Sequence, residues 1–141
     1  MPLTRDLYII WSDRNNIGIP ILDEQHRSIV ATINSLYYFV GMKRDIEVLA
    51  PTIEIITQYT RIHFRTEEAI LADCAYPDLD EHMQLHQQLV AKMKQIAAES
   101  NESGDTGVLL KFLKDWWLDH INVEDIKYAP FVLSKIKGAT G

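Results

Sequence analysis

Residues 22–40, LDEQHRSIVATINSLYYFV, have the pattern of an amphipathic helix. Asp23 can cap its first turn, and Gly41 helps to end it. The apolar residues recur at the spacing of one helix face, and they are Ile29, Ile33, Leu36, Tyr37 and Val40. His26 precedes Ile29 by three residues, which places it on the same stripe. The stretch therefore predicts a helix that turns a histidine towards the core.

Three further helices are predicted downstream. One starts near Pro51, places Ile56, Tyr59, Ile70 and Cys74 on one face, and is broken by Tyr76-Pro77. The next runs from about residue 79 to 102, with an apolar face of Leu89, Met93 and Ile96. The last begins at Asp105 or Thr106, and its inward stripe is Leu109, Leu113, Trp116 and Trp117.

Four amphipathic helices joined by short turns predict an all-α fold, an antiparallel up-down-up-down four-helix bundle. No segment alternates at period two for long enough to require a sheet. Residues 1–20 form an apolar N-terminal arm, and the residues after Asp125, with Tyr128, Phe131 and Val132, form a short C-terminal segment. Both are expected to pack on the bundle, and residues 1–141 are expected to be a single domain.

Charge and composition exclude several classes of function. The formal net charge is -6, and no cluster of Lys and Arg could follow a phosphate backbone, so nucleic acid is not expected as a partner. The longest uncharged stretch, residues 28–42, is too short and too polar for membrane insertion. A single cysteine, Cys74, rules out an internal disulfide, and with no export segment in view we expect a cytoplasmic protein.

All five histidines fall on the inward faces of these helices or at their ends. His63 is followed by Glu67, and His82 by His86, at the one-turn spacing that brings two side chains together. His120 follows the Trp116-Trp117 pair, and Asp125 comes just beyond it. Buried polar groups need partners, so a convergent set of seven points to metal binding: His26, His63, Glu67, His82, His86, His120 and Asp125.

The number and type of these residues bear on the metal. A structural zinc ion takes four ligands, often thiolates, so five imidazoles and two carboxylates exceed one such site. Two metals that share bridging carboxylates use all seven. Imidazole with a few carboxylates suits iron better than calcium or magnesium, with zinc, copper and manganese as the remaining alternatives. Asp23 and Glu24 are assigned to the helix start rather than to the metal.

From residue 11 to 128 the sequence resembles the hemerythrins, and most closely their bacterial members. The resemblance rests on Asp23-Glu24-Gln25-His26, on His63-Phe64-Arg65-Thr66-Glu67-Glu68, on His82-x-x-x-His86, and on Trp116-Trp117-Leu118-Asp119-His120-Ile121 with Asp125 and Tyr128. One His-x-x-x-His is weak evidence, whereas the ordered combination is highly specific.

The resemblance implies two iron ions per chain, bridged by Glu67, by Asp125 and by an oxo or hydroxo group. His82, His86 and His120 would bind one ion, and His26 and His63 the other, which keeps an open position for dioxygen. The resemblance also implies an apolar oxygen pocket of Ile29, Phe64, Trp116, Trp117 and Ile121. Trp117 departs from the family, which commonly has a leucine at that position.

The expected function is reversible dioxygen binding by a carrier, storage or delivery protein, which is not an enzyme and could serve an oxygen-using enzyme. The first alternative is an oxygen or redox sensor that acts on a signalling output domain. A di-iron oxidase, peroxidase or nitric oxide reductase ranks third, because no acid, base or nucleophile is evident beyond the ligands.

Overall fold

The computed structural model describes residues 6–41 and 46–140, without the side chains of residues 46–49, 121–122 and 137–140. Within these residues every regular element is helical, and there is no strand. A 3₁₀ turn, η1 (Asp13–Asn15), precedes α1 (Pro20–Gly41), α2 (Ile46–Asp73), α3 (Leu79–Ser103) and α4 (Gly107–Asp119). The π-helix η2 (His120–Asp125) then joins α4 to α5 (Ile126–Thr140).

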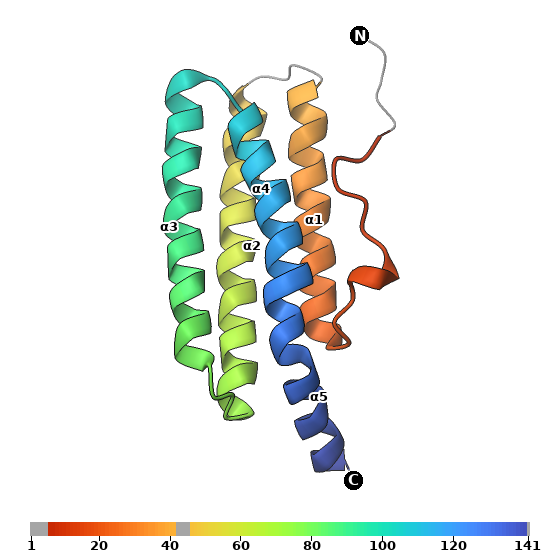
Figure 1. Ribbon diagram of the computed structural model, residues 1–141. Helices are drawn as coiled ribbons and strands as arrows, with labels where there is room; N and C mark the ends of the chain where they lie inside the picture. Colours follow the sequence, from red (N-terminus) through yellow and green to blue (C-terminus); the bar gives the residue numbers. More distant parts are fainter. Residues whose placement is uncertain (1–5, 42–45, 141) are drawn as a thin grey trace.

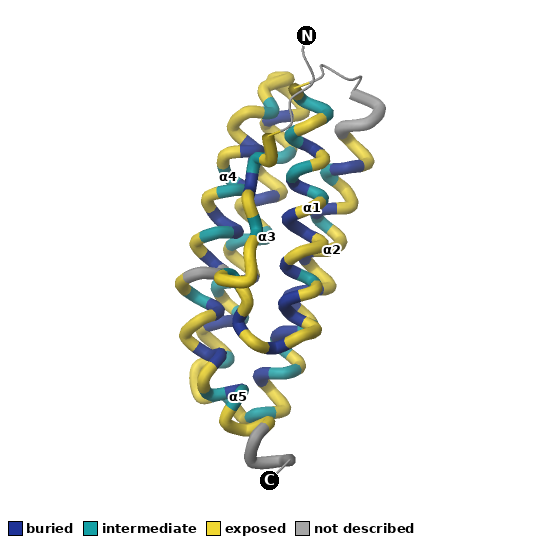
Figure 2. The backbone as a smooth tube through the Cα atoms, turned by 90° about the vertical axis from the view of Figure 1, so that its right-hand side faces the viewer, coloured by how far each residue is buried: buried dark blue, intermediate teal, exposed yellow. Residues whose placement is uncertain are grey.

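Helices α1 to α4 form the predicted antiparallel four-helix bundle (Figure 1). Packing contacts join α1 to α2, α2 to α3, α3 to α4 and α4 to α1, so each helix has two neighbours in the ring. The buried residues of each helix face inwards and the exposed residues face outwards (Figure 2). This arrangement follows from the apolar stripes, since each stripe must be covered by another helix.

The core of the bundle consists of two apolar clusters. The larger contains Ile29, Ile33, Leu36 and Trp117, and it fills the bundle from the metal-ligand candidates towards the α3–α4 turn. The smaller contains Leu22, Leu71, Tyr128 and Val132. The buried histidines and carboxylates described below belong to neither cluster.

Two sequence-based expectations for α2 were wrong. The helix begins at Ile46 rather than near Pro51, because the fixed φ of proline is compatible with a helix that starts upstream at the cost of one hydrogen bond. Tyr59 is 43% exposed, whereas its neighbour Thr60 is buried. Thr60 shares the inward face with Ile56 and His63, which sets the rotation of the helix and turns Tyr59 outwards.

The described part of the N-terminal arm, from residue 6 onwards, packs along α1, as expected, and residues 1–5 lie outside the described residues (Figure 1). Ile9 is buried, and its backbone N–H and carbonyl both bond to the Asn34 side chain, at 2.8 and 3.0 Å. Asp23 lies in the first turn of α1, but the prediction that it caps the helix is wrong, because α1 already begins at Pro20. Its carboxylate instead accepts the backbone N–H of Ile17 at 2.8 Å and of Gly18 at 3.1 Å, two residues that precede the helix. The φ of Gly18 is 92°, a conformation that favours glycine.

The C-terminal segment is a helix that continues the axis of α4 beyond the bundle (Figure 1). Tyr128 and Val132 are fully buried in the smaller cluster, in keeping with the expected packing, while Phe131 is half-buried. Cys74 is also half-buried beside this cluster. None of the described helices is both long enough and apolar enough to cross a membrane.

Candidate metal centre

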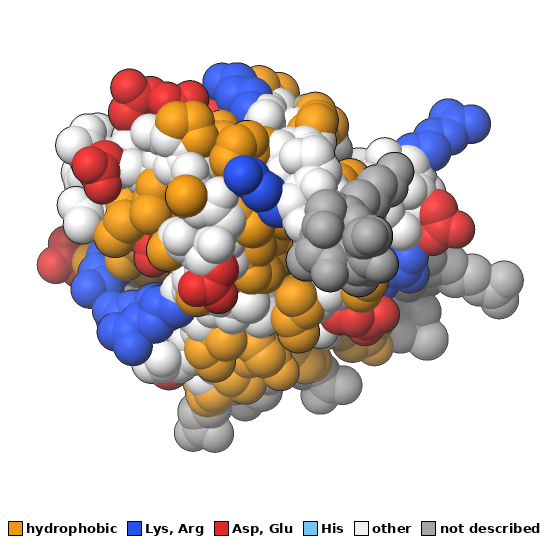
Figure 3. Space-filling model, turned by 90° about the horizontal axis from the view of Figure 1, so that it is seen from below, with side chains coloured by type: hydrophobic (Ala, Val, Ile, Leu, Met, Phe, Trp, Pro, Cys, Tyr) orange, Lys and Arg blue, Asp and Glu red, His pale blue; other side chains and the backbone are white. Residues whose placement is uncertain are grey.

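The seven predicted ligand residues come from α1, α2, α3 and the π-helix η2 that follows α4, and they meet in the interior of the bundle. His26 lies on α1, His63 and Glu67 on α2, His82 and His86 on α3, and His120 and Asp125 at the ends of η2. His82 is the most exposed of the seven, at 8%. No histidine is visible on the face of the molecule in Figure 3, in keeping with their burial.

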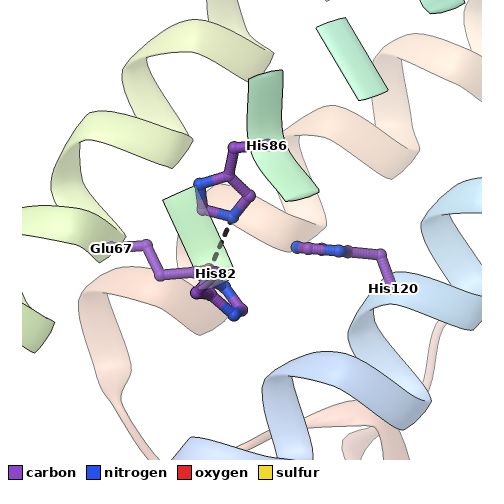
Figure 4. A group of neighbouring side chains, drawn as sticks. All are labelled: Glu67, His82, His86 and His120. Carbon is purple, nitrogen blue, oxygen red and sulfur yellow. Dashed lines mark hydrogen bonds and ion pairs between the residues drawn. The ribbon is translucent and has the colours of Figure 1, made fainter. Parts of the chain in front are cut away.

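The ligand atoms form two groups that share one residue. In each group, nitrogen or oxygen atoms of four buried residues lie within 4.8 Å of one another, the spacing at which one ion can contact all four. The first group is Glu67, His82, His86 and His120 (Figure 4). The second group is His26, His63, Glu67 and Asp125. In Figure 4 the His120 ring points from its helix towards the two rings of α3.

Glu67 faces both groups through different oxygens. Its Oε1 lies 3.0 Å from Nε2 of His86 and is also in close contact with Nε2 of His82. Its Oε2 lies 3.1 Å from Nε2 of His63, one turn earlier on the same helix. Each oxygen can therefore serve a different ion.

Asp125 has the same arrangement on the opposite side. Its Oδ1 lies 3.1 Å from Nε2 of His120 and 3.8 Å from Nε2 of His82. Its Oδ2 lies 3.2 Å from Nε2 of His26. The second carboxylate thus also lies between the three-histidine group and the two-histidine group.

Several of these short contacts lack the geometry of hydrogen bonds. Within the described residues, both oxygens of Asp125, Oε2 of Glu67 and Nε2 of His120 are buried with no hydrogen-bond partner. Glu67 and Asp125 are both 0% exposed, and a buried carboxylate without compensation is strongly destabilising. Metal cations between the two carboxylates would supply that compensation, so the donor set fits a two-metal centre.

The titration of these groups reflects burial and mutual contact. Burial would raise the pKa of Glu67, but the imidazoles of His63, His82 and His86 outweigh it and hold this pKa well below its usual range. Burial lowers the pKa of His63, which favours the neutral imidazole that a metal requires. For His120 the carboxylate of Asp125 overcomes burial, and the pKa is raised.

The π-helix explains how His120 and Asp125 come to lie together. Residues five apart on an α-helix point about 140° away from each other. In η2 the backbone hydrogen bonds span five residues instead of four, and the wider turn brings Asp125 back towards the face of His120. The sequence placed Asp125 beyond the last helical histidine but gave no sign of this turn.

The outer nitrogens of two histidines have polar partners that the sequence reasoning did not assign. Nδ1 of His63 donates to Oε1 of Gln25 at 2.9 Å, and Gln25 in turn donates to the hydroxyl of Thr66 at 3.0 Å. Nδ1 of His86 donates to Oε1 of Glu68 at 3.3 Å. A proton on Nδ1 leaves the inner Nε2 free to bind a metal. These two partners could have been suspected from the sequence, because Gln25 and Glu68 are each next to a ligand candidate.

Tyr128 is a further buried residue beside the centre. Its side chain is fully buried, and its ring centroid lies 5.4 Å from that of His82. Burial and the carboxylates of Glu67 and Asp125 raise the pKa of Tyr128, so the phenol stays protonated.

Three of the five residues predicted for the oxygen pocket, Phe64, Trp116 and Trp117, lie beside histidines of the centre. The Trp117 ring is nearest the two-histidine group, with its centroid 5.6 Å from that of His63 and 6.2 Å from that of His26. The Phe64 ring stacks on His86 of the other group at 3.8 Å. The ring centroid of Trp116 lies 5.9 Å from that of His120. Ile29 is buried in the larger cluster, and the side chain of Ile121 lies outside the described residues.

Known proteins share both the sequence pattern and the fold. A family profile described as the hemerythrin HHE cation binding domain matches residues 17–132. A bacteriohemerythrin of Pseudomonas aeruginosa is 30% identical over 126 residues, 89% of this chain and 82% of that protein. A myohemerythrin of Theromyzon tessulatum is 27% identical over 118 residues, 84% of this chain and 88% of that protein.

Among solved structures, the crystal structure of a leucine-to-alanine mutant of a hemerythrin aligns with a TM-score of 0.80. The two sequences are 21% identical, and the alignment covers 90% of this chain and 98% of the other. This likeness establishes a common fold.

Proposed function

Since the chain belongs to the hemerythrin family, with the family domain spanning residues 17–132, we propose that it binds dioxygen reversibly at a centre of two iron ions. It would act as an oxygen carrier, storage or delivery protein. Three histidines, His82, His86 and His120, would bind one ion. Two histidines, His26 and His63, would bind the other, with Glu67 and Asp125 bridging both.

The observation that carries this proposal is the orientation of the two carboxylates. Each presents one oxygen to the three-histidine group and the other oxygen to the two-histidine group. A single ion would leave part of the set unused, whereas two ions satisfy both carboxylates and all five imidazoles. Nitrogen-rich ligand sets of this type suit iron.

The unequal number of histidines supports one position for oxygen. The two-histidine ion has one imidazole fewer, so an open position would lie on that side of the centre. When bound, the iron pair supplies the electrons that dioxygen takes up. The chain contributes five imidazoles, which would hold the geometry, and the indole of Trp117, which lies beside His63 and His26 and would limit the access of water.

The ligand types favour binding over turnover. Di-iron enzymes with this bundle architecture use more carboxylates, including Glu-x-x-His motifs on two helices. Here both carboxylates of the set are committed to bridging, and the terminal positions are imidazoles, which cannot move between terminal and bridging modes. A fixed ligand set of this kind suits reversible binding.

The test is to count iron and to follow oxygen spectroscopically. We expect about two irons per chain by elemental analysis, since seven ligands serve two ions. Anaerobic reduction followed by exposure to air should produce a visible absorption band that is lost again when oxygen is removed. One metal per chain, a preference for zinc in iron-replete cells, or a spectrum that oxygen does not change would contradict the proposal.

A further inference from the structure

Two surface pockets reach the histidines of the three-histidine group, and their charges differ. The first, about 310 Å³ in volume, lies between the start of α3 and the η2–α5 junction and is lined in part by His82. The second, about 460 Å³, lies over α2 and α3 and is lined in part by His86. We name them the His82 pocket and the His86 pocket.

The His82 pocket is acidic and the His86 pocket is basic. Three carboxylates and one ammonium line the first: Asp78, Glu81, Glu124 and Lys127. Three cationic groups and one carboxylate line the second: Arg61, Arg65, Lys94 and Glu68. A divalent cation is therefore attracted to the His82 pocket and repelled from the His86 pocket.

His82 also provides the more accessible imidazole. It is 8% exposed, compared with 2% for His86, and its Nε2 contacts the carboxylate of Glu67, which belongs to both ligand groups. An ion that displaces water in the His82 pocket would thus meet a metal-binding side chain at the pocket wall. The ligand atoms of Glu67, His86 and His120 lie within 4.8 Å of the ligand nitrogen of His82.

From this geometry we infer that metal cations load into the centre through the acidic His82 pocket, with His82 as the first ligand that they meet. The inference rests on the proposed two-iron centre and adds a route to it. Glu81 and Glu124 attract the ion towards His82. Lys127, whose Nζ lies 3.1 Å from the Glu124 carboxylate, opposes this attraction.

The acidic residues at the start of α3 can also stabilise that helix, so the test needs a control variant that removes a charge from the same turn. Asp80 and Glu81 both lie in the first turn, where carboxylates favour the helix dipole. Only Glu81 lines the pocket. Asp80→Asn and Glu81→Gln therefore remove one negative charge from the same helix turn, but only the second changes the pocket.

The experiment measures the rate of iron uptake rather than oxygen binding. Iron is removed from the 141-residue chain, and circular dichroism is used to choose a temperature at which the helices remain intact. Fe²⁺ is then added anaerobically at low ionic strength, and quenching of tryptophan fluorescence is followed by stopped flow. Trp117 reports on the site because its ring lies 5.6 Å from that of His63.

We expect uptake to be about three- to tenfold slower in Glu81→Gln and faster in Lys127→Gln, with Asp80→Asn close to wild type. These differences should shrink at high salt, while the final iron content stays the same in all four proteins. A loss of fold stability alone would not slow iron uptake in Glu81→Gln and speed it in Lys127→Gln.

Equal uptake rates in wild type, Glu81→Gln and Lys127→Gln would overturn the proposed route. Faster uptake in Arg65→Gln with no effect in Glu81→Gln would assign uptake to the His86 pocket instead. A wild-type chain that takes up no iron would contradict the two-iron function itself, so the two failures are distinguishable.

Discussion

The two ring nitrogens of the site histidines have different neighbours. The inner Nε2 atoms of the histidines converge on the carboxylates, while the outer Nδ1 atoms of His63 and His86 donate to Gln25 and Glu68. These outer bonds fix the ring orientation and the tautomer, and partners of this kind commonly change metal affinity 10- to 100-fold. Glu67 and Glu68 are adjacent in sequence but serve these two different roles.

Substitution of these two glutamates should separate the roles. Glu67→Gln removes the buried charge that contacts three histidines, and we expect iron retention to fall to about half or less. Glu68→Gln should keep two irons and lower their affinity by about tenfold, because its oxygen touches only the outer nitrogen of His86. Iron content after a graded chelator wash measures both effects, and equal retention in the two variants would contradict the assignment.

Trp117 is expected to control the lifetime of the oxygenated protein. Its fully buried indole lies beside His63 and His26, where it would exclude water from the proposed oxygen position. Trp117→Leu, which restores the residue common in the family, should speed conversion of the oxygenated to the oxidised form several-fold. The decay of the visible spectrum at matched iron content provides the measurement.

Trp116→Leu is the matched control for this variant, because the Trp116 ring lies on the side of His120. Its effect on the decay should be smaller. An unchanged or slower decay in Trp117→Leu would leave Trp117 as core packing only. If the indole blocks the oxygen position, oxygen affinity should rise in the variant instead.

Among the elements, η2 has the most direct consequence for the site. One π-helical turn connects two otherwise regular helices and aligns His120 with Asp125. The extra residue of this turn is accommodated locally, so α5 keeps the rotation that buries Tyr128 and Val132. Isolated π-helical turns are often found at functional sites, where they place side chains that an α-helix would separate.

Deletion of single residues tests the role of the π-helix. Loss of Val123, an exposed residue within η2, should convert the turn to α-helix and leave His120 and Asp125 four apart on one face. We expect iron binding and the thermal transition to persist. Loss of Ile126, exposed just beyond Asp125, should rotate Tyr128 and Val132 by about 100° out of the core and lower the melting temperature substantially.

Melting curves and iron content of the two deletion variants would decide the matter. If loss of Val123 is as damaging as loss of Ile126, the π-helix is required for more than alignment of the two ligands.

In the molecule as a whole, the candidate metal ligands connect α1, α2 and α3 with η2, which directly follows α4. Two fully buried carboxylates and five buried imidazoles occupy the space between the larger and the smaller apolar clusters. Among the described residues, imidazoles are the principal neighbours of the two carboxylate charges. Metal binding should therefore contribute directly to the free energy of unfolding.

Removal of iron should destabilise the fold. A ligand that binds only the native state at 100 times its dissociation constant adds about 2.7 kcal/mol, so the metal-free chain should melt at a clearly lower temperature. Differential scanning calorimetry before and after verified iron removal checks this, with iron added back as the control. An unchanged melting temperature would show that the centre does not help to hold the bundle together.

Local patterns in the sequence predicted the four helices of the bundle and most of the candidate centre, but not that the C-terminal segment is a fifth helix, α5. The pairs His63–Glu67 and His82–His86 are each one turn apart on one helix, so their proximity follows from helix geometry alone. The apolar stripes of α1 and α4 were also predicted correctly, since burial of one face gives a periodicity that the sequence records.

Tertiary structure alone decided the contacts between helices. The rotation of α2 turns Tyr59 outwards. The register of α1 against α2 brings Gln25 into contact with His63. The packing of the helices also places one oxygen of each carboxylate beside the three-histidine group and the other beside the two-histidine group. The π-helix η2, which aligns His120 with Asp125, likewise could not be predicted from the local sequence pattern. The physical reason is that spacing along one helix fixes only neighbours on that helix, whereas rotation and register between helices depend on how all the side chains pack at once.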